Sequence, residues 1–116
     1  MKPAILRFMT TYLVLYRAAN SAAEQMSGQD PEQAAAGMEA WMTWAQTAGE
    51  AIVDLGAPTQ TVEGVDPGAT SFIGGYSLLQ AESLDELKRI LEGHPHLGWG
   101  GTIEILETLS MPGTGG

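Results

Sequence analysis

The pattern of hydrophobic and polar positions predicts two strand–helix–strand units in succession. Residues 11–17 are aromatic, aliphatic or β-branched nearly throughout, which is typical of a strand. A long helix is predicted over residues 31–55, because Asp30 and Gln33 form a capping box at its start and Gly56 follows its end. Its apolar residues recur at alternating spacings of four and three, as one helix face requires.

A weak strand at residues 57–63 completes the first unit, since Pro58 restricts it to an edge or to its first position. A turn at residues 66–68 and a glycine-containing loop at residues 69–74 lead to the second unit. Phe72 and Ile73 are expected to anchor that loop. A loop over residues 20–28, with one helical turn at most, joins the first strand to the long helix.

The second unit begins with a short apolar strand at residues 76–81, and Ser83 provides an N-cap for the helix that follows. Leu84, Leu87, Ile90 and Leu91 give that helix one apolar stripe, and Gly93 and Pro95 supply its C-terminal stop. A loop at residues 94–101 then leads to a last strand at residues 102–109, where apolar and polar residues alternate.

This order of elements predicts an α+β, ferredoxin-like βαββαβ fold, an antiparallel sheet with two helices on one face. The domain is expected to span residues 11–110. Residues 1–10 are a leader or strand extension, and residues 111–116 a flexible tail.

One face of such a sheet carries no helix and needs another cover. We expect that face to present a contiguous apolar surface, which a soluble monomer rarely exposes. The sheet of a second subunit is the simplest cover, so a homodimer is predicted. The residues expected at this pocket or dimer interface are Tyr12, Val14, Tyr16, Tyr76 and Leu78, or their register neighbours, with Trp99 from the last loop.

Composition narrows the classes of partner. The 116 residues suffice for one domain, and their net charge is -9, with only five lysines and arginines. These five form no patch, so nucleic acid is not an expected partner. The chain has no cysteine, which excludes disulfides and thiolate chemistry and fits a cytoplasmic location.

The apolar run at residues 8–16 is too short to cross a bilayer, so no membrane partner is expected. A signal peptide is the alternative, because Lys2 precedes the run and small alanines follow it. Cleavage there would remove a strand that the fold needs.

Several segments of the chain resemble the YCII-related family, in the branch called DGPF-domain proteins. They are YLVLYRA at residues 12–18, residues 31–56 with Met38, Trp41 and Trp44, and the block from GGYSLLQAESLDEL through GHPHLGWGGTIEILETLSMPG. The resemblance covers most of the chain from Thr11 on. It implies a dimeric α/β barrel, in which two ferredoxin-like sheets face each other around a cavity, and it implies a function only loosely.

The chain departs from that family's pattern at the residues that carry chemistry. YCII-type relatives imply a histidine on the first helix and an aspartate before a Pro-aromatic pair, which act together as acid and base. Here the first helix has no histidine, and His94-Pro95-His96 stands at the Asp-Pro position. The DGPF tetrapeptide is also absent, so the dyad cannot be carried over.

His94 and His96 are candidate catalytic residues, as a base and its orienting partner, and they lie in an extended segment around Pro95. They are alternatively two metal ligands that need a carboxylate such as Glu104. In a purely structural alternative, His94 caps the carbonyls at the end of the second helix and His96 packs at the rim.

Glu104 is the third candidate catalytic residue, because it lies in mid-strand between two isoleucines on what should be the barrel-facing side of the sheet. Burial there would raise its pKa. In the structural alternative, the Glu104 carboxylate accepts a hydrogen bond at the dimer interface from Tyr12, Tyr16 or a backbone amide. Trp99 would close a pocket mouth or anchor its loop. Trp41 and Trp44 are expected to pack in the core.

Two functions remain open at this point. In the first, a homodimer binds a small apolar molecule in a shared cavity, with cofactor-free proton transfer of the isomerase or lyase type. In the second, the same cavity or surface serves a non-enzymatic binding or interaction module. A polar pocket with a titratable group would favour the first.

Overall fold

The computed structural model describes residues 9–19, 28, 30–64 and 68–109. Its sheet consists of β1 (Thr10–Ala18), β2 (Ile52–Pro58), β3 (Phe72–Ala81) and β4 (Thr102–Glu107). The strand order is β2-β3-β1-β4, and all three neighbouring pairs are antiparallel. The α+β architecture and the ferredoxin-like order of strands are therefore as predicted.

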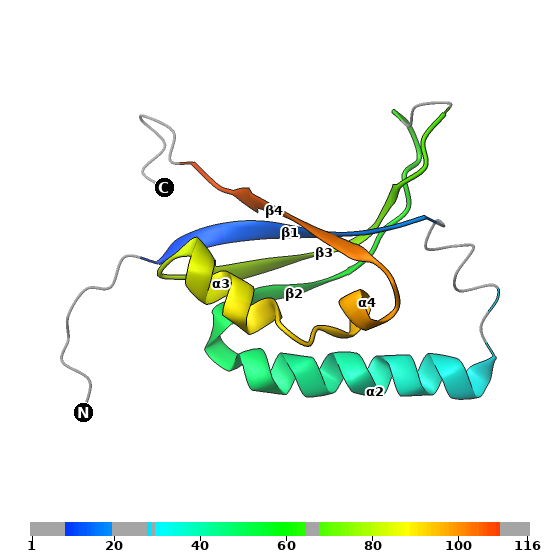
Figure 1. Cartoon of the computed structure of the whole chain (residues 1–116), viewed down its shortest axis with the longest axis horizontal. Helices are drawn as coiled ribbons and strands as arrows, with labels where there is room; N and C mark the ends of the chain where they lie inside the picture. The colour runs from blue at the N-terminus through cyan, green and yellow to red at the C-terminus, as the bar shows by residue number, and fades with distance from the viewer. Residues whose placement is uncertain (1–8, 20–27, 29, 65–67, 110–116) are drawn as a thin grey trace.

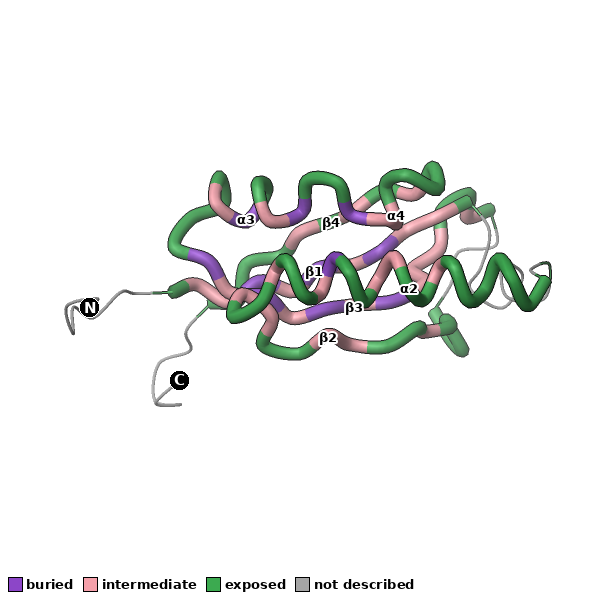
Figure 2. Tube along the Cα trace, turned by 90° about the horizontal axis from the view of Figure 1, so that it is seen from below, coloured by how far each residue is buried: buried purple, intermediate pink, exposed green. Residues whose placement is uncertain are grey.

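The helices cover one face of this sheet (Figure 1). They are α2 (Pro31–Ala48), α3 (Leu84–Leu91) and the short α4 (Pro95–Gly98). Figure 2 shows α2 lying across β1 and β3, with α3 and α4 toward the β4 edge of the sheet. Both predicted caps are present, since Asp30 and Gln33 form a capping box and the Ser83 hydroxyl accepts the Glu86 N–H.

The core lies between the helices and the sheet. Alternate residues of β1 and β3 point toward the helices and are buried there with side chains of α2 and α3. The buried hydrophobic residues are Tyr12, Val14, Tyr16, Trp44, Leu79, Ala81, Leu87 and Leu91.

The predicted position of Tyr12, Val14 and Tyr16 on the uncovered face is therefore wrong. They pack beneath the helices, and their neighbours Leu13 and Leu15 occupy the uncovered face. Alternation along a strand shows which residues share a face but not which face receives the helices.

The predicted extension of the first helix to Leu55 is also wrong. The helix ends at Ala48, a 3₁₀ turn follows at Gly49–Ala51, and β2 begins at Ile52. Gly49 has a φ of 56°, which breaks the helix. Ile52 and Leu55 nevertheless pack against the core, so they continue the apolar pattern from a strand.

Further elements differ from the predicted ones. The strand predicted at residues 57–63 lies earlier, at Ile52–Pro58, and β3 begins at Phe72, inside the predicted loop. The loop at residues 94–101 contains α4, and the last strand ends at Glu107. The predictions for residues 1–8, 20–27, 66–67 and 111–116 lie outside the described residues.

Candidate functional site

His94 is the more buried of the two histidines. It follows α3 after Gly93, whose φ is 73°, and is 1% exposed. Its backbone N–H donates to the Leu91 carbonyl at 3.1 Å. Its ring Nδ1 accepts the His96 N–H at 3.0 Å, so the ring caps the start of α4. The alternative in which this side chain caps the carbonyls of the second helix is therefore corrected.

Three aromatic rings from two other elements surround the His94 imidazole. Tyr16 of β1 stacks on it with centroids 4.9 Å apart and planes at 27°. Trp41 of α2 meets it at 4.5 Å and 88°, and Trp44 at 4.4 Å and 59°. The Trp44 indole N–H also donates to the Ile90 carbonyl at 3.0 Å, which fixes α2 against α3. The imidazole is therefore held on several sides.

The hydrogen bond at Nδ1 determines which tautomer His94 adopts. A backbone N–H can only donate, so Nδ1 carries no proton and the neutral ring carries its proton on Nε2. Nε2 is buried and has no hydrogen-bond partner among the described residues. A buried donor without a hydrogen-bond partner is costly and rare.

Burial also controls the protonation of His94 and Tyr16. Removal from water, aided by the nearby His96, lowers the pKa of His94 to about 4. Burial raises the pKa of Tyr16 to about 12, against the opposing effect of its hydrogen bond to Ser77. The Tyr16 hydroxyl donates to Ser77 Oγ at 2.8 Å, and Ser77 donates to the Leu55 carbonyl at 2.6 Å. The Tyr16 proton is therefore already engaged.

His96 has a packing role in this structure. Its Nε2 donates to the Arg17 carbonyl at 2.8 Å, because a carbonyl can only accept. A Cβ on Gly101 would lie 2.2 Å from that nitrogen, so only glycine leaves room for the ring. His96 thus joins α4 to the end of β1.

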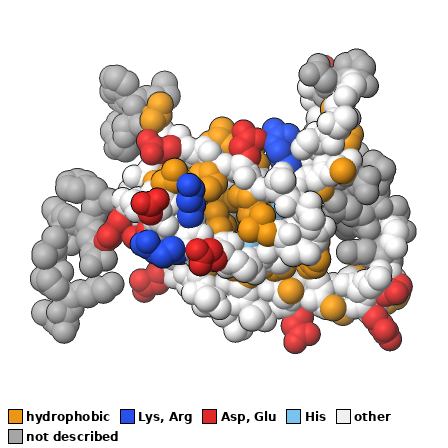
Figure 3. Space-filling view, viewed as in Figure 1, with side chains coloured by type: hydrophobic (Ala, Val, Ile, Leu, Met, Phe, Trp, Pro, Cys, Tyr) orange, Lys and Arg blue, Asp and Glu red, His pale blue; other side chains and the backbone are white. Residues whose placement is uncertain are grey.

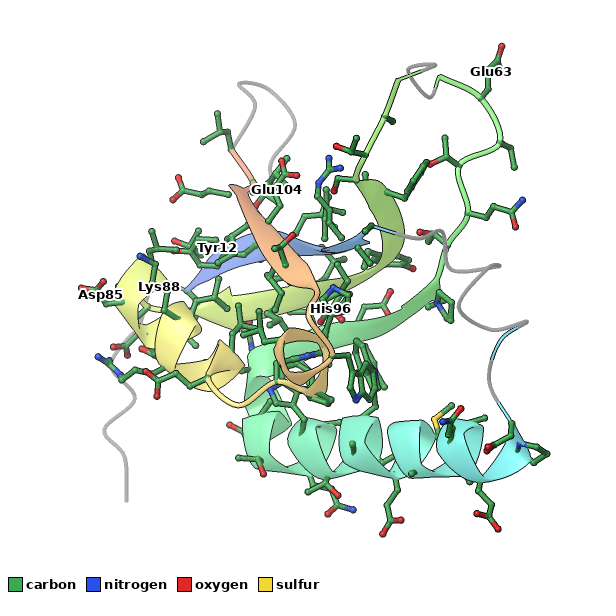
Figure 4. The ribbon with its side chains drawn as sticks, turned by 45° about the vertical axis from the view of Figure 1, so that its right-hand side comes forward. Tyr12, Glu63, Asp85, Lys88, His96 and Glu104 are labelled. Carbon is green, nitrogen blue, oxygen red and sulfur yellow. The ribbon has the colours of Figure 1, made fainter. Side chains whose placement is uncertain are left out.

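Glu104 lies on the opposite face of the sheet from the two histidines. It is in mid-strand as predicted, but its side chain is 45% exposed and pairs with Arg17 Nε at 2.6 Å. Its register partner is Leu15, on the uncovered face, whereas Tyr12 and Tyr16 face the helices. Figure 4 shows Glu104 farther from the helices than His96. The structure therefore brings Tyr16, His94 and His96 together and leaves Glu104 apart.

A groove of about 990 Å³ runs between α2, α3 and α4, and we call it the helical groove. Trp44, His94 and Trp99, the last of which follows α4 as its C-cap, are among the lining residues. Trp99 is 57% exposed and rests over Gly37 of α2, where an added Cβ would be 3.5 Å from its ring. Figure 3 shows hydrophobic side chains gathered in the middle of the face that α3 and α4 present, with charged ones mostly around them. The other lining residues are Ala36, Glu39, Ala40, Thr43, Thr47, Ala48, Glu86, Arg89, Ile90, Glu92, Gly93, Pro95, Leu97 and Gly98.

Comparison with protein families identifies the chain. The family profile of the YCII-related domain matches residues 9–111, from the start of β1 to beyond β4. The chain belongs to the YCII-related family. No curated protein matches it.

The match to the YCII-related family includes every residue that lines the helical groove. Within it α2 carries no histidine, and His94 precedes Pro95. The acid–base pair that the resemblance implied thus has no counterpart on α2. The α2 residues Trp41 and Trp44 pack against the His94 ring.

The described residues contain no group of three or more histidine, aspartate or glutamate side chains placed to hold a metal ion. The metal alternative for the two histidines therefore lacks its third ligand there, since Glu104 pairs with Arg17. Within the same residues, no helix is long and apolar enough to cross a membrane.

The cluster that His94 forms with Trp41 and Trp44 was not predicted from the sequence. A usable pattern was present, because Trp41 belongs to the apolar stripe of the long helix and His94 lies between Gly93 and Pro95, which stop the next helix. What the pattern lacked was the distance between the two helices, which tertiary packing sets.

Proposed function

We propose that this member of the YCII-related family binds a small, largely apolar molecule in the helical groove. The volume of about 990 Å³ is at the upper end of the range usual for ligand pockets. Alanines and threonines of α2 leave room along one wall, and Trp44 and Trp99 offer aromatic surface. The observation that carries the proposal is the groove itself, a space of about 990 Å³ with Trp44 and Trp99 in its lining.

Binding is better supported than acid–base turnover. The proton-transfer hypothesis needs Glu104 near a histidine, and Glu104 faces the other side of the sheet and pairs with Arg17. Nε2 of His96 already donates to the Arg17 carbonyl. His94 is thus the one of the three candidate catalytic residues that both lines the helical groove and has a nitrogen without a partner within the described part of the chain.

We also propose that two copies pair through the uncovered side of the sheet, which we call the open face. Leu13, Leu15, Tyr76 and Leu78 meet there as register partners on β1 and β3, and each is only half-buried in one chain. A soluble protein rarely leaves such a surface in water, and a second copy presents the same surface. Because α2, α3 and α4, which border the helical groove, cover the opposite face of the sheet (Figure 1), pairing would leave the groove accessible.

Ligand binding by a groove-blocked variant tests the proposed function. Ala40→Trp places an indole in the helical groove, whereas Ala35→Trp adds the same group to α2 at an exposed position that does not line the groove. Saturation-transfer NMR with neutral aromatic compounds such as indole and acetophenone should detect binding to the parent and to Ala35→Trp. It should detect little or none with Ala40→Trp.

Equal binding by the two variants would place the ligand elsewhere. No binding to the parent at millimolar compound would count against the function itself. Thermal unfolding followed by circular dichroism shows whether both variants keep the fold, so that a lost ligand signal is not mistaken for a lost structure.

A further inference from the structure

We infer that the ligand stacks on the indole of Trp99, so that the helical groove selects compounds with a flat aromatic ring over saturated compounds of similar size. The inference rests on the proposed function, and it adds the chemical class of the ligand and the side chain that recognises it. An aromatic ring stacks on an indole through the charge distribution of both π-systems, and a saturated ring has no π-system.

The first step concerns which tryptophan a ligand can reach, because both Trp44 and Trp99 line the helical groove. Trp44 is 6% exposed and packs against the rings of Trp41 and His94. Its indole N–H already donates to the Ile90 carbonyl. Trp99 is 57% exposed, and within the described residues its side chain has neither a contact with another aromatic ring nor a hydrogen bond. Trp99 is therefore the aromatic surface that is open to a ligand.

The second step concerns how the backbone of Trp99 is held. Its N–H donates to the carbonyls of Pro95 and His96, at 3.2 and 3.3 Å. The next N–H, that of Gly100, donates to the Leu97 carbonyl at 3.2 Å. These bonds close the turn that follows α4. A side chain presented from a hydrogen-bonded turn loses less entropy on binding than one on an unbonded loop, which favours stacking on this indole.

The third step concerns the space around the indole. Gly98 and Gly100 flank Trp99 in the chain, and an added Cβ at either glycine would meet nothing within 4 Å. On the α2 side, the six-membered ring of the indole lies over Gly37, where an added Cβ would be 3.5 Å from Cη2. Two alanines of α2, Ala36 and Ala40, are among the lining residues on that side. The residues next to the indole are thus small, which leaves room for a second flat ring.

Two neutral compounds of similar size test the inference, namely N-benzylacetamide and N-(cyclohexylmethyl)acetamide. They carry the same amide, so the net charge of -9 and any hydrogen bond to that amide affect both alike. The cyclohexyl compound is the more hydrophobic, so burial alone would favour it. We expect N-benzylacetamide to bind roughly two- to ten-fold more tightly, as the usual strength of an aromatic pair implies.

Protein labelled with fluorotryptophan reports where the compounds bind. The chain has three tryptophans, and the ¹⁹F NMR signal that is lost in Trp99→Leu belongs to Trp99. N-benzylacetamide should shift this signal more than those of Trp41 and Trp44, because a stacked ring exerts its ring current on the indole beneath it.

Variants assign the preference to Trp99. Trp99→Leu keeps an apolar side chain and removes the aromatic ring, so the preference for N-benzylacetamide should disappear. Trp99→Phe keeps a smaller ring and should retain part of it. Met38→Ala is the control, because Met38 is 65% exposed on α2 and does not line the helical groove, so the preference should be unchanged. If Trp99→Leu does not fold by circular dichroism, Trp99→Phe and the titrations of the parent protein still decide.

The outcomes separate this inference from the proposed function. Equal binding of the two compounds, tighter binding of the saturated one, an unshifted Trp99 signal, or a preference that persists in Trp99→Leu overturns the inference. The binding function then stands if Ala40→Trp still abolishes binding. Binding of both compounds that survives Ala40→Trp, or no binding of either at millimolar concentration, removes both.

Discussion

The imidazole of His94 is stacked on the phenol ring of Tyr16, with centroids 4.9 Å apart and planes at 27°. The contact joins the central strand β1 to the turn between α3 and α4. Burial lowers the pKa of His94 to about 4 and raises that of Tyr16 to about 12. Both rings are therefore neutral at neutral pH, and the contact between them does not depend on charge.

This burial makes stability depend on pH. The pKa of His94 is about 4 in the folded chain and takes its ordinary value of 6.5 once the chain unfolds, so the unfolded state binds the proton more readily between these values. His94 should therefore contribute fully above pH 6.5, and its contribution should fall as the pH drops toward 4 and level off below. The loss should reach at most about 3 kcal/mol. Urea unfolding at pH values across this window measures it.

A change of pH acts on the whole protein, so the comparison must isolate His94. His94→Phe removes this titration and leaves Glu39, Glu86, Glu92 and His96 in place. The free energy of unfolding of the parent should fall more steeply with acid than that of the variant. If the free energy of unfolding falls in parallel for the two proteins as the pH drops, His94 binds protons equally in the folded and unfolded states.

The parts of the fold that the sequence predicted correctly depend on local chemistry. Asp30 and Gln33 mark the start of α2, and Ser83 and Gly93 bracket α3, because caps and stops act within a few residues. The order of elements then follows from counting strands and helices. The end of α2 was missed because Ile52 and Leu55 keep the helical spacing while they pack on the core from β2.

The candidate site was less predictable because its residues come from separate elements. Tyr16, Trp41 and His94 meet only after the two halves of the chain pack together. The position of Tyr12 and Tyr16 beneath the helices was missed because alternation does not show which face of β1 the helices cover, whereas Glu104 lies on the uncovered face as expected. Tertiary packing determines which of these residues meet and which face of the sheet the helices cover.

Ser77 supports Tyr16 from beneath the helices. It accepts the Tyr16 hydroxyl and donates to the Leu55 carbonyl, so Ser77→Ala should leave two buried polar groups without their partner. We expect a loss of about 1–3 kcal/mol in the free energy of unfolding, measured with urea. Tyr16→Phe on its own should cost less, because the Ser77 hydroxyl keeps the Leu55 carbonyl. The loss of unfolding free energy in the double variant should be smaller than the sum of the two single losses. A loss equal to that sum would mean that the two hydroxyls do not interact.

Gly101 provides space for the His96 ring. Gly101→Ala should push the ring off the Arg17 carbonyl and cost about 1–2 kcal/mol, since the ring can move only by breaking that bond. Gly98→Ala is the matched control, because a Cβ there meets open space. Thermal unfolding compares the two, and His96→Ala should reduce the penalty at Gly101. A Gly101→Ala protein as stable as Gly98→Ala would show that the loop adjusts without cost.

The proposed pairing through the open face predicts a homodimer in sedimentation at micromolar concentration. Leu78→Asp should shift it to monomers, because Leu78 lies opposite Leu13 at the centre of that face and a buried carboxylate is costly. Val62→Asp is the control, since Val62 is largely exposed outside the sheet. With -9 on each chain, the parent dimer should tighten as salt rises, because screening acts over about 10 Å at 0.1 M. A parent that sediments as a monomer at every concentration, or a Leu78→Asp variant that stays dimeric, would contradict pairing through this face.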